Sequence, residues 1–319
     1  MAVAEKATER RPTPKRVGRR RRGFHPGKGW LVLPPTAYLL ALLIFPIILV
    51  GMYSLFLLTN LTGVIATFSY QDWLNFFPNK WSFFPPWNTD SPFWNTFTKS
   101  MGITVLVSLL TTAAAYPVAY YLAFIAHRRR YVLLLVLLAP FFTSFLLRVL
   151  AWQVMLNNNG VINSLLWELG LRDQGNAVSW LINTWFSVGL VLAYSWIPFV
   201  ALPMFVVMEN MDRRLIEAAQ DLGASRFMTF LRITLPLSLP GVIAGFVFVL
   251  IPTTGEFITP LLVGGPSSFM FGNSIQSFFT DTPNWNYGAV LALWLVAIVL
   301  VMLLLFGRYL STDLEDAAT

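Results

Sequence analysis

Two ionisable side chains, Arg148 and Glu256, lie inside long apolar segments, where a charge is costly. Such residues usually pair with an opposite charge or serve a transport path. Each lies equally far past the start of its segment, at Tyr131 and Leu239, so continuous helices would place both about 25 Å above one membrane surface. One prediction is a mutual ion pair that holds the helices in register. The other is that the Glu256 carboxylate faces a transport path and meets a cationic solute.

Aromatic side chains near the same height suit a cationic solute, because an amine attracts a ring face by about 0.5–2 kcal/mol. The candidates for a substrate path, with Glu256, are Trp152, Tyr194, Trp196 and Phe257. The alternative is that these rings only pack or form an interfacial belt. The chain has no cysteine, and His25 and His127 lie outside the apolar segments, so we expect no thiol chemistry, no metal site and no catalytic residue.

The elements that position these residues are apolar segments long enough to cross a bilayer. The chain is 56% hydrophobic and only 12% charged, which no soluble core explains. The segments are Trp30 to Leu58, Met101 to Ile125, Tyr131 to Leu156, Leu181 to Met208, Leu239 to Val263 and Tyr287 to Leu310. The first is too long for a cleavable signal peptide. The sequence therefore predicts an all-α integral membrane protein with about six transmembrane helices, residues 30–310.

Basic residues in the connections predict the orientation, because Lys and Arg are retained on the cytoplasmic side. They cluster in residues 1–29, after the second and fourth segments and at Arg308, which places both termini in the cytoplasm. Residues 1–29 are expected to be a disordered tail that anchors to anionic lipid rather than to nucleic acid. Residues 311–319 are predicted to be a short acidic tail.

Two outer connections are unusual. Residues 59–99 carry four tryptophans, which predict either an interfacial belt or a docking surface for an external partner; these are Trp73, Trp81, Trp87 and Trp94. The segment Asn157 to Trp180 contains an amphipathic piece, Val161 to Gly170, which predicts a short interfacial helix.

The long inner connection, residues 209–236, predicts two short helices joined at a glycine. Asp212 suits the N-cap of the first helix, and Gly223 suits the left-handed backbone that ends it. Apolar positions at helical spacing follow Ala224, and Pro236 opens the next membrane segment. Together they predict a compact knob outside the membrane.

This loop resembles the EAA loop of ABC-importer permeases. Every position of that pattern is filled at the required spacing, by Glu217, Ala218, Ala219, Gly223, Ile233, Leu235 and Pro236. In that family the loop is the coupling helix, which sits in a groove of a cytoplasmic ATPase and carries its closure to the membrane helices. The resemblance therefore implies a type I importer bundle with an ATPase-coupling loop.

Further stretches look like the polyamine (spermidine and putrescine) branch of these permeases, and the likeness runs from about Trp30 to Leu310. They begin APFFTSFLLRVLAWQVML, YSWIPFVALPMFVV, PTTGEFITPLLVGG and NWNYGAVLAL. The family implies alternating-access import through a bacterial inner membrane. It also implies two ATPase subunits, a second, related permease subunit and an extracytoplasmic substrate-binding protein.

Energy must come from a partner, because the chain has no G-x-x-x-x-G-K-[ST] phosphate loop. We therefore expect no cofactor on this chain, with ATP and Mg²⁺ bound by the ATPases. A permease for another small solute is the nearest alternative. A membrane enzyme would need a polar catalytic cluster, and a stand-alone channel would leave the coupling loop without a purpose.

Overall fold

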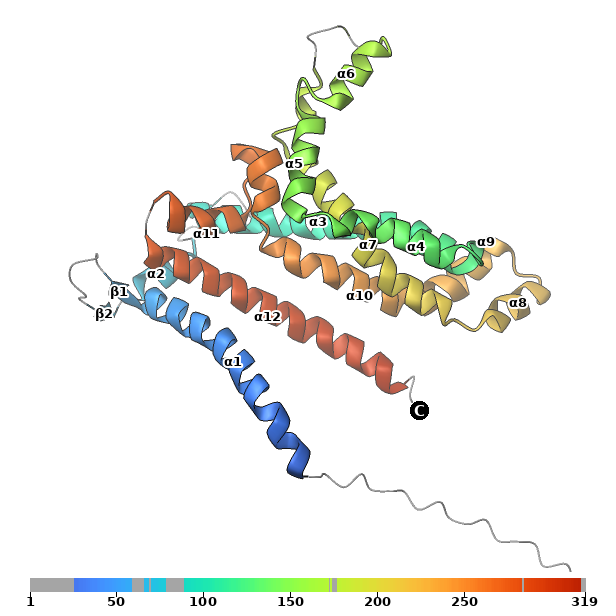
Figure 1. Cartoon of the computed structure of the whole chain (residues 1–319), viewed down its shortest axis with the longest axis horizontal. Helices are drawn as coiled ribbons and strands as arrows, with labels where there is room; N and C mark the ends of the chain where they lie inside the picture. Colours follow the sequence, from blue (N-terminus) through green and yellow to red (C-terminus); the bar gives the residue numbers. More distant parts are fainter. Residues whose placement is uncertain are drawn as a thin grey trace, which may run out of the picture. The chain divides into compact units, whose positions relative to one another are not determined.

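The computed structural model of the chain describes residues 26–58, 66–68, 70–78, 89–171, 173, 177–282 and 284–316. Nearly all of the described secondary structure is helical, as the sequence predicts (Figure 1). The exception is a small antiparallel hairpin of β1 (Phe56–Leu58) and β2 (Ala66–Phe68), with Phe56 opposite Phe68. Most of the predicted basic tail lies outside the described residues.

Helix α1, Pro26–Leu55, belongs mainly to the first of two compact units, which divide after Ile48. It is long and apolar enough to cross a membrane over Leu33–Leu55. Its apolar side chains are exposed, including Leu39 and Tyr38, each 65% exposed. A helix that is apolar all round is stable in lipid, because its backbone groups bond within the helix.

The second unit, from Leu49 onward, holds the other helices. They are α2 (Gln71–Leu74), α3 (Pro92–Tyr120), α4 (Arg130–Leu138), α5 (Phe145–Leu156), α6 (Val161–Glu168), α7 (Trp185–Glu209), α8 (Arg213–Asp221), α9 (Arg226–Thr229), α10 (Leu235–Thr254), α11 (Phe271–Thr280) and α12 (Trp285–Asp316). Three π-helical turns interrupt or extend them, at Tyr121–Ile125, Phe230–Thr234 and Pro260–Gly264. Short 3₁₀ turns lie at Ala139–Phe142, Ser179–Leu181 and Pro266–Ser268.

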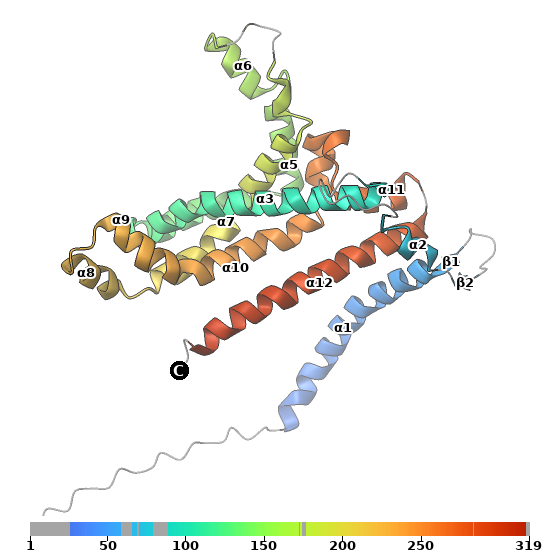
Figure 2. The same ribbon diagram turned by 180° about the vertical axis from the view of Figure 1, so that it is seen from behind.

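Helices α3, α7 and α10 form the core of this unit and lie side by side in both ribbon views (Figures 1 and 2). Small residues let the backbones of α7 and α10 approach closely, as is common between membrane helices. A Cβ atom on Gly245 would lie 2.9 Å from the carbonyl oxygen of Val200, and one on Gly241 would lie 2.9 Å from that of Pro203. The packing at these two positions therefore has room for the hydrogen atom of a glycine and not for a methyl group.

The third predicted span is broken. The pieces Arg130–Phe142 and Phe145–Glu168 meet at 86°, so α5 and α6 leave α4 almost at a right angle. Thr143 adopts extended backbone at the break. Within the described residues five other helices are long and apolar enough to cross a membrane, which agrees with the predicted number of about six if the bent pair is one span. The predicted short helix after Val161 is α6.

The tryptophans of the outer connection that are described pack into an aromatic cluster. Trp73 lies 5.6 Å from the Trp294 ring on α12, and Trp94 lies 5.6 Å from the Phe76 ring, which is itself buried. Burial raises the pKa of the neighbouring Asp72 carboxyl on α2 above its ordinary value. These rings fasten the outer connection to the bundle, which the predictions of a belt or a docking surface did not include. Trp81 and Trp87 lie outside the described residues.

Candidate coupling surface and transport path

The inner connection folds as the sequence predicts at its first helix and its glycine. The Asp212 carboxylate caps α8 by accepting a 3.0 Å hydrogen bond from the Arg214 backbone N–H. Helix α8 ends at a left-handed Gly223 with φ of +85°. The Gly223 and Ala224 backbone N–H groups then donate to the Gln220 and Ala219 carbonyls at 2.9 and 3.0 Å. The glycine therefore turns the chain while the last carbonyls of α8 stay bonded.

The second half of this connection differs in one respect from the single helix predicted after Ala224. The Ser225 hydroxyl caps the four-residue helix α9. A π-helical turn, Phe230–Thr234, then leads into α10 without a break. Ile233, Leu235 and Pro236 lie at this junction, so the end of the EAA pattern marks where the loop becomes a membrane helix.

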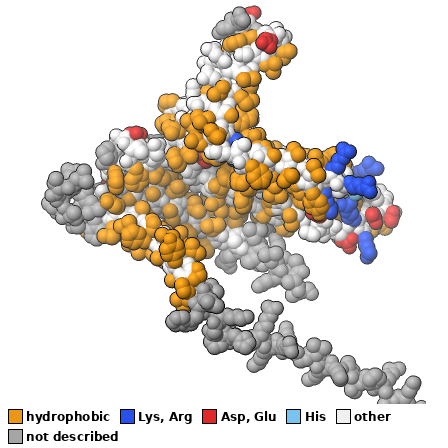
Figure 3. Space-filling model, viewed as in Figure 1, with side chains coloured by type: hydrophobic (Ala, Val, Ile, Leu, Met, Phe, Trp, Pro, Cys, Tyr) orange, Lys and Arg blue, Asp and Glu red, His pale blue; other side chains and the backbone are white. Residues whose placement is uncertain are grey.

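The surface of the knob is exposed and partly apolar. Glu217 and Ala218 are exposed on α8, and Ala219 is half-buried. Leu222 is 89% exposed and Phe227 is 73% exposed. Charged side chains gather at this end of the unit, whereas apolar side chains are widespread over the described remainder of this face (Figure 3). Large apolar side chains among charges, outside the hydrocarbon, are typical of a surface that another protein covers.

The predicted ion pair between Arg148 and Glu256 is not found: among the described residues the ion pair that forms joins Arg130 and Glu209, at 2.8 Å. Equal depth for the two residues requires that both helices be continuous. Arg148 instead lies beyond the 86° bend, and Glu256 lies after the end of α10 at Thr254. Counting 1.5 Å per residue from the inner ends therefore does not place them at one height.

The Glu256 carboxylate caps the next helical segment. Its Oε1 accepts hydrogen bonds from the Ile258 and Thr259 backbone N–H groups, at 2.9 and 3.0 Å. Both hydrogen bonds fall on one oxygen, and within the described residues Oε2 accepts none. The helix break after Pro252 to Gly255, expected from composition, is present. Glu256 is half-buried, so one carboxylate oxygen is held by the backbone and the other is available to a cation.

Arg148 lies against rings rather than a carboxylate. Its guanidinium carbon is 5.8 Å from the centre of the Phe141 ring and 5.9 Å from that of Phe145. Its Nε is buried, with no hydrogen-bond partner among the described residues. Cation–π attraction at about 6 Å partly offsets the cost of the charge.

The predicted path aromatics are only partly brought together. The Trp152 and Tyr194 rings meet edge to face at 5.3 Å. Trp196 instead lies 5.7 Å from Phe199 and packs against the buried core, and its Nε1 is buried without a partner in the described part. Phe257 is 38% exposed beside Glu256 in the chain. Packing accounts for Trp196, whereas Phe257 and Tyr194 stay candidates for the path.

Sequence reasoning missed a polar network between the start of α4 and the end of α7. It includes Arg130, Tyr131 and Glu209, and it adjoins Arg213, the first residue of α8. A lone acid at the end of the apolar segment 181–208, with an arginine at the start of another apolar segment, was the available signal.

Comparison with known proteins identifies relatives over about two thirds of the chain. Residues 115–314 match the family described as binding-protein-dependent transport system inner membrane component. The chain is 37% identical to the spermidine/putrescine transport system permease protein PotB of Haemophilus influenzae, over 69% of this chain and 74% of that protein. It is 33% identical to PotB of Escherichia coli, over 69% of this chain and 78% of that protein.

Solved structures share the fold. A crystal structure of a bacterial ABC transporter involved in the import of the acidic polysaccharide alginate superposes with a TM-score of 0.61. The alignment covers 90% of this chain and 96% of that one, at 18% identity. The alginate transporter in complex with an alginate pentasaccharide-bound periplasmic protein matches equally well, with a TM-score of 0.61.

Proposed function

The chain belongs to the family of binding-protein-dependent transport system inner membrane components, and we propose that it carries polyamines such as spermidine and putrescine. As a member it is a multi-pass inner-membrane permease subunit of an ABC importer. The observation that carries the polyamine proposal is 33–37% identity to spermidine/putrescine permeases over 69% of the chain.

The site supports a cationic cargo. A linear polyamine that leaves water needs each ammonium group met by a carboxylate or a ring face. The half-buried Glu256 offers Oε2, and the adjacent Phe257 is partly exposed. Because the backbone holds Oε1, the carboxylate is positioned before the cargo arrives, which reduces the entropy lost on binding.

We propose four partners for the chain. Two ATPases dock on the knob of α8 and α9, bind ATP and Mg²⁺, and close in each cycle. A second, related permease completes the path, and an extracytoplasmic binding protein delivers the cargo. The exposed Leu222 and Phe227 support ATPase docking, and the alginate transporter with its periplasmic protein supports the last partner. This chain itself acts as a transporter subunit and not as an enzyme, with both termini in the cytoplasm.

Uptake into vesicles tests the proposal. The chain is purified with its co-expressed partners and reconstituted, with the binding protein outside and ATP inside. We expect ATP-dependent accumulation of labelled spermidine and putrescine, and no accumulation of neutral sugars. ATP-dependent uptake of another solute alone would reassign the cargo. A purified chain that carries no ATPase, and transports or reacts without ATP, would favour a channel or a membrane enzyme instead.

A further inference from the structure

The connection from Glu209 to Pro236, here called the coupling loop, is tied at both ends to α3, although the chain joins it only to α7 and α10. At its start, the Arg213 Nη2 donates a 2.9 Å hydrogen bond to the Ala123 carbonyl in the π-helical turn that ends α3. At its far end, the Phe230 ring packs edge to face on Tyr116 and Tyr120, each at 5.9 Å. Helix α3 therefore contacts both ends of the loop.

The Arg213 contact has a clear physical basis. The last carbonyls of a helix have no partner within the helix, and they form the negative end of its dipole. A guanidinium meets both needs, since it donates a hydrogen bond and carries a positive charge. Arg213 also lies 5.8 Å from the Phe124 ring. Arg213, the first residue of α8, therefore caps the end of α3, which lies about ninety residues earlier in the chain.

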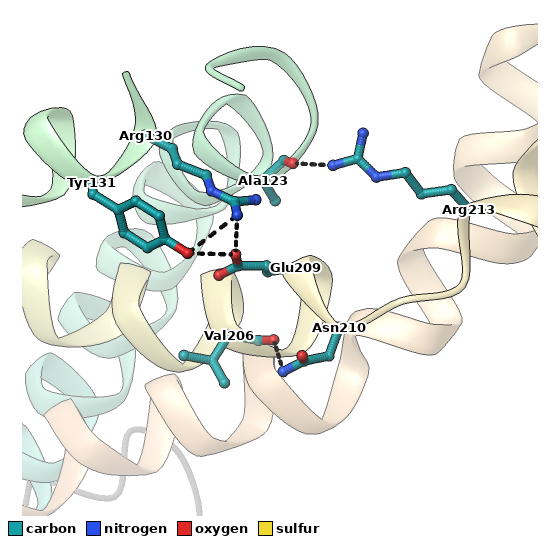
Figure 4. A network of polar contacts seen from close by, with 7 residues as sticks. All are labelled: Ala123, Arg130, Tyr131, Val206, Glu209, Asn210 and Arg213. Carbon is teal, nitrogen blue, oxygen red and sulfur yellow. Dashed lines mark hydrogen bonds and ion pairs between the residues drawn. The ribbon is translucent and has the colours of Figure 1, made fainter. Parts of the chain in front are cut away.

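A second contact fastens α4 to the point where α7 turns into the loop (Figure 4). Glu209 is the last residue of α7, and its Oε1 lies 2.8 Å from the Arg130 guanidinium. The Tyr131 hydroxyl donates to the same oxygen at 3.2 Å and accepts from Arg130 at 3.1 Å. Each of the three side chains bonds to the other two, which makes the contact more specific than an isolated surface ion pair.

Both contacts between α3 and the loop involve π-helical turns. Ala123 lies in the turn Tyr121–Ile125, and Phe230 begins the turn Phe230–Thr234. Such turns are rare, interrupt the regular ladder of hydrogen bonds, and occur frequently at functional sites.

We propose that Arg130, Glu209, Arg213 and the Ala123 carbonyl form a coupling latch, which delivers displacement of the coupling loop to α3 and α4 as well as to α7 and α10. The latch rests on the proposed function, because an attached ATPase must move the loop. Its side chains position helices and do not touch the cargo.

The test uses the reconstituted importer with all its subunits. The variants are Glu209→Gln, Arg213→Gln and the exchange Arg130→Glu/Glu209→Arg. The matched control is Arg129→Gln, which removes the neighbouring charge and whose side chain makes no hydrogen bond, ion pair or ring contact among the described residues. We expect both single latch variants to keep the ATPase bound while the spermidine imported per ATP hydrolysed falls at least about fivefold, the lower end of typical coupling between sites. The control should match the original chain, and the exchange should restore import to within about twofold of it, as expected when the pair is the essential interaction.

A second measurement needs no variant. Amide hydrogen exchange of the assembled importer, with ATP and with ADP, should show a nucleotide-dependent change in protection at residues 121–125. No change there, with changes confined to the ends of α7 and α10, would overturn the latch even if a variant failed to assemble. The latch would also be overturned if Arg129→Gln lowered spermidine import per ATP as much as Glu209→Gln does. Loss of bound ATPase in the latch variants, in step with the loss of import, would overturn it too. Failure of the proposed function reads differently, since the original chain would then bind no ATPase or import no spermidine.

Discussion

The side-chain amide of Gln153 on α5 donates a 2.7 Å hydrogen bond to the carbonyl of Leu262, in the π-helical turn that follows Glu256. This contact joins two irregular parts of the fold. One is the segment of α5 and α6 that lies beyond the 86° bend, and the other is the π-helical turn that follows the end of α10. In a membrane a carbonyl freed by such a break needs a partner from the protein. Gln153 supplies it.

Replacing this amide should destabilise the bundle. Gln153→Leu keeps the volume but leaves the Leu262 carbonyl unpaired, which costs about 1 kcal/mol of unfolding free energy. Unfolding of the purified chain in detergent, followed by tryptophan fluorescence, measures the change. Gln276→Leu is the control, because within the described residues the Gln276 side chain bonds only to an exposed Thr280 hydroxyl. Equal stability of the two variants would show that the Gln153 contact contributes nothing.

Two glycines of α10 should tolerate no methyl group. In Gly245→Ala or Gly241→Ala the new Cβ would press on the α7 backbone, so we expect a loss of about 1–3 kcal/mol in unfolding free energy. Gly102→Ala on α3 meets nothing within 4 Å, and the helix should gain about 0.5–1 kcal/mol. The same unfolding experiment compares the three variants. An α10 variant as stable as Gly102→Ala would contradict the close packing.

The sequence was sufficient to predict the membrane spans and the first half of the coupling loop, because these follow from local rules. Apolar length decides which helices cross, and Asp212 and Gly223 have the backbone roles that their chemistry favours. The 86° bend was missed, because the apolar segment from Tyr131 to Leu156 has no polar interruption long enough to break it. Tertiary contacts beyond the bend, such as that of Gln153 with Leu262, are not contained in hydropathy either.

The charged residues show the same limit. Arg148 and Glu256 were paired by counting along continuous helices, and the two breaks invalidate the count. Arg130 and Glu209 do pair, but they are distant in sequence and lie at helix ends, where charges are common and a partner is not implied. Spatial neighbours of this kind require the fold.

The coupling loop should depend on the left-handed backbone at Gly223. In Gly223→Ala this conformation costs roughly 1–2 kcal/mol, so we expect α8 to shift and less ATPase to co-purify. Gly170→Ala is a matched control, because Gly170 has φ of +68°, is equally unobstructed and lies beyond α6. Quantifying bound ATPase by gel measures the effect. If Gly223→Ala bound as much ATPase as the original chain, the turn at Gly223 would not be needed for docking.

The orientation can be tested with single cysteines, since the chain has none of its own. Asn158→Cys and Asn284→Cys should react with an impermeant maleimide in cells whose outer membrane has been permeabilised. Ala219→Cys, in the coupling loop, should react only after the inner membrane is opened. Early labelling of Ala219→Cys would invert the proposed topology.

Glu256 has two roles that different substitutions separate. Its Oε1 holds the Ile258 and Thr259 N–H groups, and its charge would meet the cargo. In Glu256→Gln the amide oxygen still accepts those hydrogen bonds but the charge is gone, so the importer should assemble while spermidine uptake falls about tenfold, the effect of losing roughly 1.4 kcal/mol of interaction. In Glu256→Ala the cap is lost too, and stability should drop by a further 1 kcal/mol or so.

Arg148 provides the control that decides whether the charge serves the cargo or a hidden pair. Because Arg148 lies against Phe141 and Phe145 and not against Glu256, its replacement should act independently. The uptake of Glu256→Gln/Arg148→Gln should therefore equal the product of the two single effects. Recovery of full uptake in the double variant would mean that the two charges balance each other during transport, and the cargo role of Glu256 would then be wrong.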